Sequence, residues 1–370
     1  MDVQKHRLHA LCPYFAMFPP TFARTHILTF TSPGAAILDP FSGRGTTLLE
    51  GLLLGRQALA LDVNPVASCV TGAKARVPRL AAVRARLAYL EHELGQGDPV
   101  DLHEEAQSLP PFFSYAFHAR TLRELLFLRR RLDWHNEDVD RFIAALTLGS
   151  LHGEMDKSPS YFSNQMPRTI STKPEYSIKY WHGRGLKARR RRVFTILRRR
   201  ARLRLREPGP RRSGVAIQAD ARRAGYLLES WRGQVQAIVT SPPYLNVTNF
   251  EEDQWLRLWF LGGPPRPTYG RISRDDRYSK SESYWQFLAE AWQGIAGLMA
   301  PGGFIVCRIG GKGQDADSLA RGIVATLRSA LADAQLVYGP ATSAPVKRQT
   351  DNFRPGTVGC GLEADFVFRL

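Results

Sequence analysis

Four residues that could take part in chemistry, Ser241-Pro242-Pro243-Tyr244, follow a predicted strand in which residues 237–239 form a short unbroken apolar run. A short unbroken apolar run is typical of a strand buried in a parallel sheet, and two consecutive prolines cannot continue its ladder. The prolines also favour extended geometry, so the Ser241 hydroxyl and the Pro242 carbonyl are held rigidly where the strand ends. Fixed acceptors beside the flat ring of Tyr244 suit a planar ring that carries an exocyclic amine, such as a nucleobase.

The same tetrapeptide in isolation is more typical of a surface turn or a polyproline ligand. A second motif, Asp39-Pro-Phe-Ser-Gly-Arg-Gly-Thr-Thr47, favours the chemical interpretation. It follows an apolar run at residues 35–38 and opens a helix predicted over residues 46–54, and a second strand is predicted at residues 58–62. The order strand, glycine turn, helix, strand predicts the first half of a doubly wound nucleotide-binding fold, in which ligands bind at the carboxyl edge of the sheet.

The glycine spacing does not match a dinucleotide fingerprint, because Leu48 stands where the third glycine would be. An acid before the turn, an aromatic residue inside it and an acid after the next strand instead suit a ligand with an amino-acid tail, a cation and a ribose. S-adenosylmethionine is such a ligand. In this interpretation Asp39 accepts from its ammonium, Phe41 faces its sulfonium, and Asp62 binds the ribose hydroxyls.

Residues 39–47 resemble motif I of the DNA amino-methyltransferases, and Thr240-Ser-Pro-Pro-Tyr244 resembles their motif IV. The resemblance covers roughly residues 15–70 and 213–370. It implies that Ser241, Pro242, Pro243 and Tyr244 form the catalytic motif, and that Asp220 reads the adenine amino group of the cofactor. The complete set that it implies for S-adenosylmethionine is Phe18, Pro19, Asp39, Pro40, Phe41, Gly43, Gly45, Thr46, Thr47, Asp62, Asn64, Asp220 and Ala221.

In that family Ser-Pro-Pro-Tyr is typical of site-specific enzymes that methylate N4 of cytosine, whereas Asp-Pro-Pro-Tyr or Asn-Pro-Pro-Tyr is more usual for N6 of adenine. The resemblance therefore implies methyl transfer to N4 of a flipped cytosine in duplex DNA, with Tyr244 stacked on the extruded base, in restriction-modification or epigenetic marking. A cognate restriction endonuclease is a candidate partner. The alternatives are N6-adenine methylation, a methyltransferase for RNA or protein, and a catalytically silent nucleic-acid-binding protein.

The predicted fold is an α/β, Rossmann-like, doubly wound methyltransferase sheet with an antiparallel edge strand and a largely helical insertion. Residues 364–370 alternate and are the candidate edge strand, and residues 249–261 are predicted to form a helix whose aromatic side chains pack on the sheet. Residues 1–75 and 213–370 are expected to form the catalytic domain. Residues 76–212 are expected to form a basic insertion that binds DNA and recognises the target.

A net charge of +17 predicts a polyanionic partner, and double-stranded DNA is the expected one. Residues 187–206 predict an amphipathic helix with a dense arginine face, and residues 158–177 predict a polar loop. A solvated face and a membrane surface are the alternatives for such a charge run. The predicted nucleic-acid contacts are Arg168, Lys173, Arg189, Arg190, Arg191, Arg192, Arg198 and Arg199.

The four cysteines are scattered along the chain and form no close pair, which argues against a disulfide framework and a structural zinc site. No metal site is predicted. The chain does not start like a signal peptide, and no apolar run approaches about 20 residues. These features predict a cytoplasmic protein, associated with the nucleoid of a bacterium or archaeon, without a membrane anchor.

Overall fold

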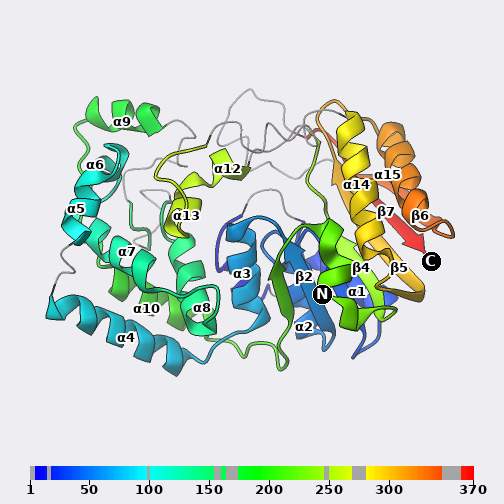
Figure 1. Cartoon of the computed structure of the whole chain (residues 1–370), viewed down its shortest axis with the longest axis horizontal. Helices are drawn as coiled ribbons and strands as arrows, with labels where there is room; N and C mark the ends of the chain where they lie inside the picture. Colours follow the sequence, from blue (N-terminus) through cyan, green and yellow to red (C-terminus); the bar gives the residue numbers. More distant parts are fainter. Residues whose placement is uncertain are drawn as a thin grey trace.

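In this computed structural model a seven-stranded sheet is covered by helices on both faces and stands beside a largely helical region (Figure 1). The structure describes residues 5–14, 18–97, 101–153, 160–163, 174–245, 250–268, 281–343 and 360–370. Within these ranges no helix is both long and apolar enough to cross a bilayer. The strands are β1 (Ala36–Asp39), β2 (Gln57–Asp62), β3 (Val215–Gln218), β4 (Val235–Thr240), β5 (Met299–Gly310), β6 (Gln335–Ser343) and β7 (Glu363–Arg369).

The strand order is β3-β2-β1-β4-β5-β7-β6, and the first five strands are parallel. The chain starts in the middle at β1, winds outward to β3, and then crosses back to β4 on the other side of β1. This reversal between β1 and β4 is the topological switch point, where the carboxyl ends of the strands form a ligand-binding edge. The predicted α/β doubly wound fold is confirmed.

The last strand differs from the prediction in its position. β7 is antiparallel to its neighbours, as expected, but it lies between β5 and β6, so β6 forms the edge. Ala364, Phe366 and Phe368 point into one hydrophobic layer, and Val367 points into the other. This alternation identified a strand. The edge strand was missed because Gly339 and Pro340 interrupt its sequence pattern.

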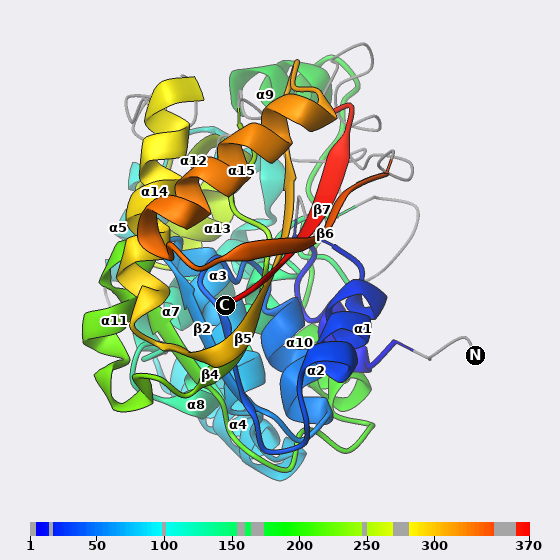
Figure 2. The same cartoon turned by 90° about the vertical axis from the view of Figure 1, so that its right-hand side faces the viewer.

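Two helical layers cover the sheet (Figure 2). α14 (Ser281–Ala296) and α15 (Ala316–Ala330) pack on one face, against side chains that include Ile238 and Ile305. α1 (Pro20–Phe30) and α2 (Thr46–Leu53) pack on the other face, against Ala237 and Val239. α2 approaches closely because it carries Gly51, where a Cβ would lie 2.2 Å from the side chain of Ile37.

The helical region has its own hydrophobic core and shares α3 with the sheet half. Its helices lie on the left in Figure 1. The helices whose bounds have not yet been given are α3 (Pro65–Ala75), α4 (Leu80–Gln96), α5 (Asp101–Ser108), α6 (Phe112–Ala116), α7 (Ala119–Arg131), α8 (Asp138–Leu148), α9 (Pro174–His182), α10 (Val193–Arg204), α11 (Ala224–Leu227), α12 (Phe250–Asp253) and α13 (Trp255–Phe260). Short 3-10 turns are found at η1 (Arg7–Ala10), η2 (Ala221–Arg223) and η3 (Glu229–Trp231).

The helix predicted at residues 249–261 is divided into α12 and α13, and its aromatic side chains do not pack on the sheet. Trp255 lies 4.9 Å from Phe112, and Trp259 lies 4.6 Å from Phe113, measured between ring centroids. Both tryptophans belong to the core of the helical region. The prediction was wrong because α1, α2, α14 and α15 already cover both faces of the sheet.

The arginine-rich helix is shorter than predicted. α10 begins at Val193, so the arginines at positions 189–192 precede it. Its start is fixed from α7, where Thr121 exchanges hydrogen bonds with the backbone of Arg191 and the Glu124 carboxylate accepts from the Val193 N–H at 2.6 Å. Apolar spacing begins only at Val193, so nothing would hold a longer helix against the core.

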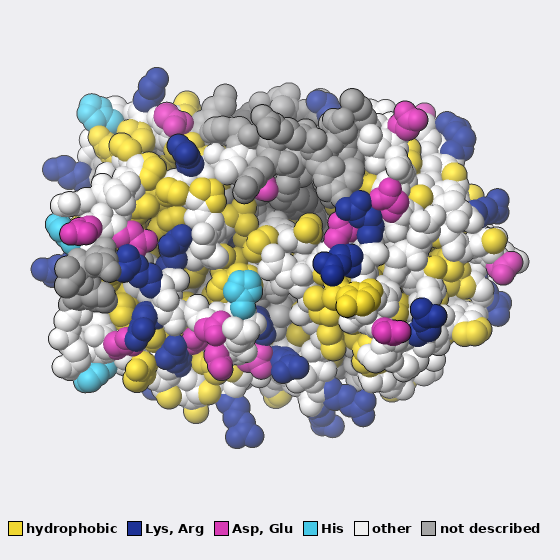
Figure 3. All heavy atoms as spheres, viewed as in Figure 1, with side chains coloured by type: hydrophobic (Ala, Val, Ile, Leu, Met, Phe, Trp, Pro, Cys, Tyr) yellow, Lys and Arg dark blue, Asp and Glu magenta, His cyan; other side chains and the backbone are white. Residues whose placement is uncertain are grey.

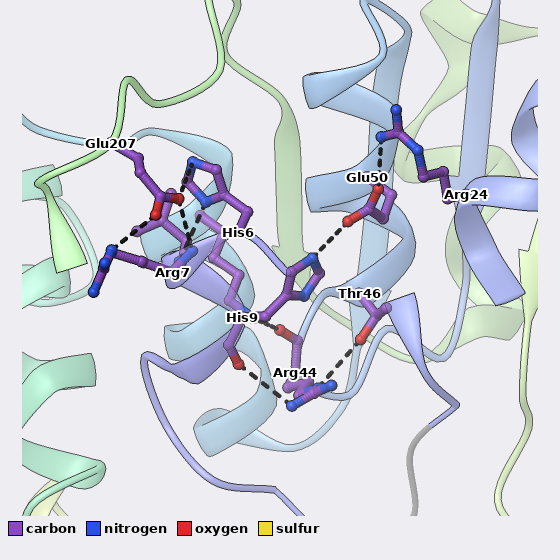
Figure 4. Close-up of polar contacts among 10 residues, drawn as sticks. His6, Arg7, His9, Arg24, Arg44, Thr46, Glu50 and Glu207 are labelled. Carbon is purple, nitrogen blue, oxygen red and sulfur yellow. Dashed lines mark hydrogen bonds and ion pairs between the residues drawn. The ribbon is translucent and has the colours of Figure 1, made fainter. Parts of the chain in front are cut away.

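Residues 6–11 join the sheet half to the helical region (Figure 4). The buried His9 imidazole hydrogen-bonds the Glu50 carboxylate of α2 at 2.7 Å, and Arg44 donates to the His9 carbonyl. On the other side, Arg7 pairs with Glu207 at 2.8 Å. This segment therefore connects the glycine turn to the chain that follows α10.

Candidate active site

The two predicted motifs meet at the carboxyl edge of the sheet. β1 and β4 are parallel neighbours, with Leu38 beside Ile238. The Thr240 hydroxyl donates to the Asp39 carboxylate at 2.7 Å, although these residues are 201 positions apart in the chain. The first helical turn is joined to β4 as well, because the Thr47 hydroxyl donates to the Val239 carbonyl at 2.8 Å. The glycine turn and Ser241 therefore lie side by side.

The glycine turn needs both of its glycines. Gly43 and Gly45 have φ angles of 50° and 72°, in the left-handed region that favours glycine. A Cβ at Gly45 would also lie 2.8 Å from the Thr71 hydroxyl. Gly45 precedes the first helical residue, Thr46, and no described side chain caps this start of α2. The backbone N–H groups of a first helical turn have no partner within the helix, so these groups and the helix dipole favour an anionic group there.

Asp62 ends β2 and is fixed by the backbone on both carboxylate oxygens. It accepts from the Gly43 N–H at 2.8 Å and from the Asn64 N–H at 2.9 Å. Burial raises the pKa of Asp62 to about 6, against these two hydrogen bonds, which lower it. Asn64 in turn caps α3 through the Val66 N–H. Each Asp62 oxygen retains a lone pair that can accept from a hydroxyl group.

Asp39 is almost completely buried at the end of β1. Its Oδ1 accepts from Thr240 and from the Phe41 N–H, whereas its Oδ2 has no hydrogen-bond partner within the described part of the chain. Burial raises the pKa of Asp39 to about 7, although the hydrogen bonds from Thr240 and Phe41 lower it. A buried carboxylate oxygen without a partner is a place for a cationic donor.

Phe18, Pro19 and Phe41 flank this edge. Pro40 is buried between Asp39 and Phe41, and the Phe41 ring lies edge-on to Phe287 of α14, with 5.9 Å between centroids. Pro19 precedes the first residue of α1, and Phe18 packs on Phe22 at 5.0 Å.

Asp220 is placed near the site and is already engaged. The backbone after β3 is tied to the end of β2, because the Ala219 N–H donates to the Asp62 carbonyl. The Asp220 carboxylate accepts two hydrogen bonds from the Arg222 guanidinium, at 3.0 and 2.7 Å, and Arg222 also binds Glu290. Ala221 is buried beneath this pair.

The Ser241-Pro242-Pro243-Tyr244 segment leaves the sheet and then follows β5, where Leu245 pairs with Gly311. Pro242 is buried, and the other three residues are half-buried. The Tyr244 phenol donates to the Glu363 carboxylate at 3.1 Å. Burial and Glu363 raise the pKa of Tyr244, and a side-chain hydrogen bond with Ser241 lowers it.

Tyr14 is a site residue that the sequence did not indicate. Its buried ring lies 3.6 Å from the position that a Cβ on Gly43 would occupy, and its phenol accepts from the Asn64 amide at 3.4 Å. Burial and the nearby Asp62 raise its pKa. Tyr14 lies in an irregular segment, so no periodicity marked it.

Arginines from the predicted basic helix line a surface hollow of about 210 Å³, formed by Arg190, Arg191, Arg192, Thr195, Ile196 and Arg199. Arg198 instead pairs with Glu91, and Arg189 is exposed. On the face seen in Figure 3, basic side chains are spread among acidic ones. The predicted contacts Arg168 and Lys173 lie outside the described residues. Within the described ranges no group of three or more His, Cys, Asp or Glu side chains could hold a metal ion.

Comparisons with known proteins agree with the site. Residues 2–68 match the family model N6_N4_Mtase, described as DNA methylase. The Type II methyltransferase M.SmaI of Serratia marcescens is 39% identical over 51 residues, which are 14% of this chain and 18% of that protein. The chain thus matches less than a fifth of the length of that curated relative.

Two solved structures show weaker similarity. The rRNA methyltransferase aviRa from Streptomyces viridochromogenes has a TM-score of 0.38 at 12% identity, over 100% of this chain and 93% of that one. A putative rRNA-methylase from Clostridium thermocellum has a TM-score of 0.34 at 8% identity, over 96% of this chain and 100% of that one. The sequence match itself contains β1, the glycine turn and β2, and over this part of its length the chain is similar to the DNA methylases.

Proposed function

We propose that this protein transfers a methyl group from S-adenosylmethionine to an exocyclic amine of a base in duplex DNA, with N4 of cytosine as its target. The observation that supports this most directly is the 2.7 Å hydrogen bond from Thr240 to Asp39. It holds the residue at which the glycine turn begins against Thr240, which precedes Ser241, so that a methyl donor and an amine could meet at one sheet edge.

The residues around the glycine turn fit S-adenosylmethionine. The unpartnered Oδ2 of Asp39 would accept from its ammonium, directly or through a water molecule, and the uncapped start of α2 would receive its carboxylate. Asp62 has lone pairs for the ribose hydroxyls, and Phe41 offers a ring to the cation. When bound, the cofactor supplies an electrophilic methyl group on sulfur. This chain's part is to bind it and to align it with the amine.

The Ser241 hydroxyl and the Pro242 carbonyl would hold the target amine. An exocyclic amine is a poor nucleophile because its lone pair is delocalised into the ring. Two fixed acceptors that bind its hydrogens would tilt the nitrogen toward a tetrahedral shape and free that lone pair. The surplus proton would then leave to water. A paired base cannot reach this edge, so the proposal includes flipping of the base, at a cost of a few kcal/mol.

The choice of cytosine N4 over adenine N6 depends on Ser241. The serine occupies the position where related enzymes for adenine more usually carry Asp or Asn, while the Pro-Pro-Tyr that follows is shared. Adenine N6 is the second candidate, because both amines need the same two acceptors. A role in restriction-modification or epigenetic marking, with or without a partner endonuclease, and a cytoplasmic location would follow from either target.

The arginine hollow is the proposed contact with the DNA backbone. Arg191, Arg192 and Arg199 form no ion pair with any described carboxylate, so three like charges converge on one hollow. The planar guanidinium matches a phosphate with two parallel donors, and neutralisation by a phosphate would relieve the repulsion between the arginines. The paired Arg198 is less available for this contact.

The proposal is tested by incubating the purified chain with unmethylated duplex DNA and methyl-labelled S-adenosylmethionine, followed by digestion and mass spectrometry of the nucleosides. Labelled N4-methylcytosine is the expected product. Labelled N6-methyladenine would identify adenine N6, the second candidate, as the target instead. Absence of S-adenosylmethionine binding in calorimetry would overturn the enzymatic proposal and favour a silent nucleic-acid-binding protein.

A further inference from the structure

A carboxylate on β7 closes a chain of contacts that begins at Ser241. The Tyr244 phenol donates to Glu363 Oε1 at 3.1 Å, and a side-chain interaction with Ser241 lowers the pKa of Tyr244. The other oxygen of Glu363 lies 3.7 Å from the Arg308 guanidinium of β5. Nothing in the sequence connects Glu363 with Ser241, because the two residues lie far apart in the chain and on different strands.

The strand register makes this arrangement rigid. β5 and β7 pair in antiparallel fashion, with Arg308 opposite Asp365 and Gly310 opposite Glu363. Arg308 forms two hydrogen bonds with Asp365, at 2.6 and 2.8 Å. Gly310 makes room for the tyrosine ring, since a Cβ there would lie 3.1 Å from a ring carbon of Tyr244. The carboxylate and the phenol are therefore set by the sheet itself.

Arg308 is held from a second direction. Its guanidinium lies over the Phe22 ring of α1, 4.2 Å from the centroid, which favours a cation by its π face. The Arg308 and Glu363 side chains are largely buried, with 14% and 22% of their surfaces exposed. The Glu363 carboxylate, with this guanidinium beside it, is placed to act as a hydrogen-bond acceptor.

We propose that Glu363 is a positioning residue that fixes the direction of the Tyr244 and Ser241 hydroxyls, so that Ser241 Oγ presents lone pairs to the target amine. The Tyr244 hydroxyl donates its single hydrogen to the Glu363 carboxylate. The Tyr244 oxygen is then left to accept the hydrogen of Ser241. With that hydrogen turned away, the serine oxygen is an acceptor on its open side. This inference rests on the proposed methyl transfer.

The first test is Glu363→Gln, which keeps the size of the side chain but can donate as well as accept. Both hydroxyl directions then become accessible, and kcat for DNA methylation is expected to fall about tenfold or more. The KM for DNA and the Kd for S-adenosylmethionine are expected to stay within about twofold, because neither DNA nor the cofactor would contact Glu363. Asp317→Asn, which removes an exposed carboxylate from the first turn of α15, is the matched control.

Tyr244→Phe interrupts the same chain of contacts in the middle. If the two residues act as one unit, the double variant loses no more activity than the more damaged single variant. The inference would be overturned if the activity losses of the two single variants multiplied in the double variant. A wild-type kcat in Glu363→Gln would overturn it as well.

A spectroscopic readout separates this inference from the proposed function. The ultraviolet Raman doublet of tyrosine reports whether a phenol donates or accepts, and the difference between wild type and Tyr244→Phe isolates Tyr244. We expect the signal of a phenol that both donates and accepts in the wild type, and a change of that signal in Glu363→Gln. A wild-type protein that shows this signal but methylates no base would refute the function and keep the hydroxyl order. A Tyr244 that does not donate would refute the order itself.

Discussion

At the scale of single residues, Asp39, the proposed contact for the cofactor ammonium, also affects stability. Its folded-state pKa of about 7 is higher than that of an unfolded aspartate, because burial disfavours the charged form. The folded state therefore binds the proton more tightly. The stability that this proton contributes is fully present below the unfolded pKa of about 4 and is lost as the pH rises through about 7.

Asp39→Asn is therefore expected to be more stable than the wild type at pH 8, by on the order of 2–4 kcal/mol, and nearly equal to it near pH 4. The asparagine Oδ1 can still accept from Thr240, so the edge of the sheet is retained. Urea unfolding across this pH range measures the difference. A difference independent of pH would contradict the argument. The variant should also bind S-adenosylmethionine weakly, since it lacks the charge that meets the ammonium.

Substitutions of Ser241 and Asp62 should affect different measured constants, kcat for the first and the cofactor Kd for the second. Ser241→Ala removes an acceptor for the amine, so we expect kcat to fall about 10²-fold or more with cofactor affinity nearly unchanged. Asp62→Ala removes a hydroxyl acceptor and the anchor of Gly43, so the Kd for S-adenosylmethionine should rise instead. Calorimetry and turnover measurements on both variants check this. The reverse pattern would exchange the two roles.

The sequence indicated those candidate residues that stand next to a recognisable local element. Asp39 and Asp62 end predicted strands on either side of a glycine turn, and Ser241 follows directly after a third strand. Tyr14 and Glu363 remained unseen, because each reaches the site through the packing of segments distant in the chain. Local residue patterns contain no information about the register of β5 and β7, which determines where Glu363 lies.

At the scale of elements, the start of one helix was predicted correctly. Thr46 begins α2 directly after the glycine turn, as the sequence indicated. α10 starts later than predicted because Glu124 of α7 accepts from the Val193 N–H and fixes the first residue of the helix there. α13 was predicted as a helix and assigned to the wrong core, since an apolar helical face does not specify what covers it.

The aromatic cluster around α13 gives a stability prediction. Trp255 is buried against Phe112 and Phe113, so Trp255→Ala should lower the free energy of unfolding by roughly 3–5 kcal/mol. Tyr226→Ala, at a residue with 76% exposure, should change it by less than about 0.5 kcal/mol. Urea unfolding of both variants measures the contrast. Equal effects would mean that α13 does not hold the helical region together.

At the scale of the whole molecule, not all of the positive charge behind the net charge of +17 is available to a partner. Several arginines are used internally, such as Arg44 and Arg200, which are buried and donate to backbone carbonyls. Arg191, Arg192 and Arg199 line one hollow and form no ion pair with any described carboxylate. This arrangement makes the hollow beside α10 the proposed place of contact with DNA.

Arg191→Ala and Arg199→Ala are each expected to weaken binding of duplex DNA and to reduce the slope of log affinity against log salt by about 1. Arg328→Ala removes one exposed arginine from α15, at the other end of the molecule, and should leave the slope nearly unchanged. Fluorescence anisotropy across a range of salt concentrations measures all three. An equal effect of Arg328→Ala would assign binding to overall charge.

The hydrogen bond between Asp39 and Thr240 has a consequence for biosynthesis. Its partners are 201 positions apart, and Arg7 and Glu207 are separated by 200. At about 5–20 residues per second, a ribosome needs roughly 10–40 s to pass from one partner to the other. During that time the nascent glycine turn lacks the strand that completes its sheet edge. The proposed cofactor site is therefore complete only after most of the chain has been translated.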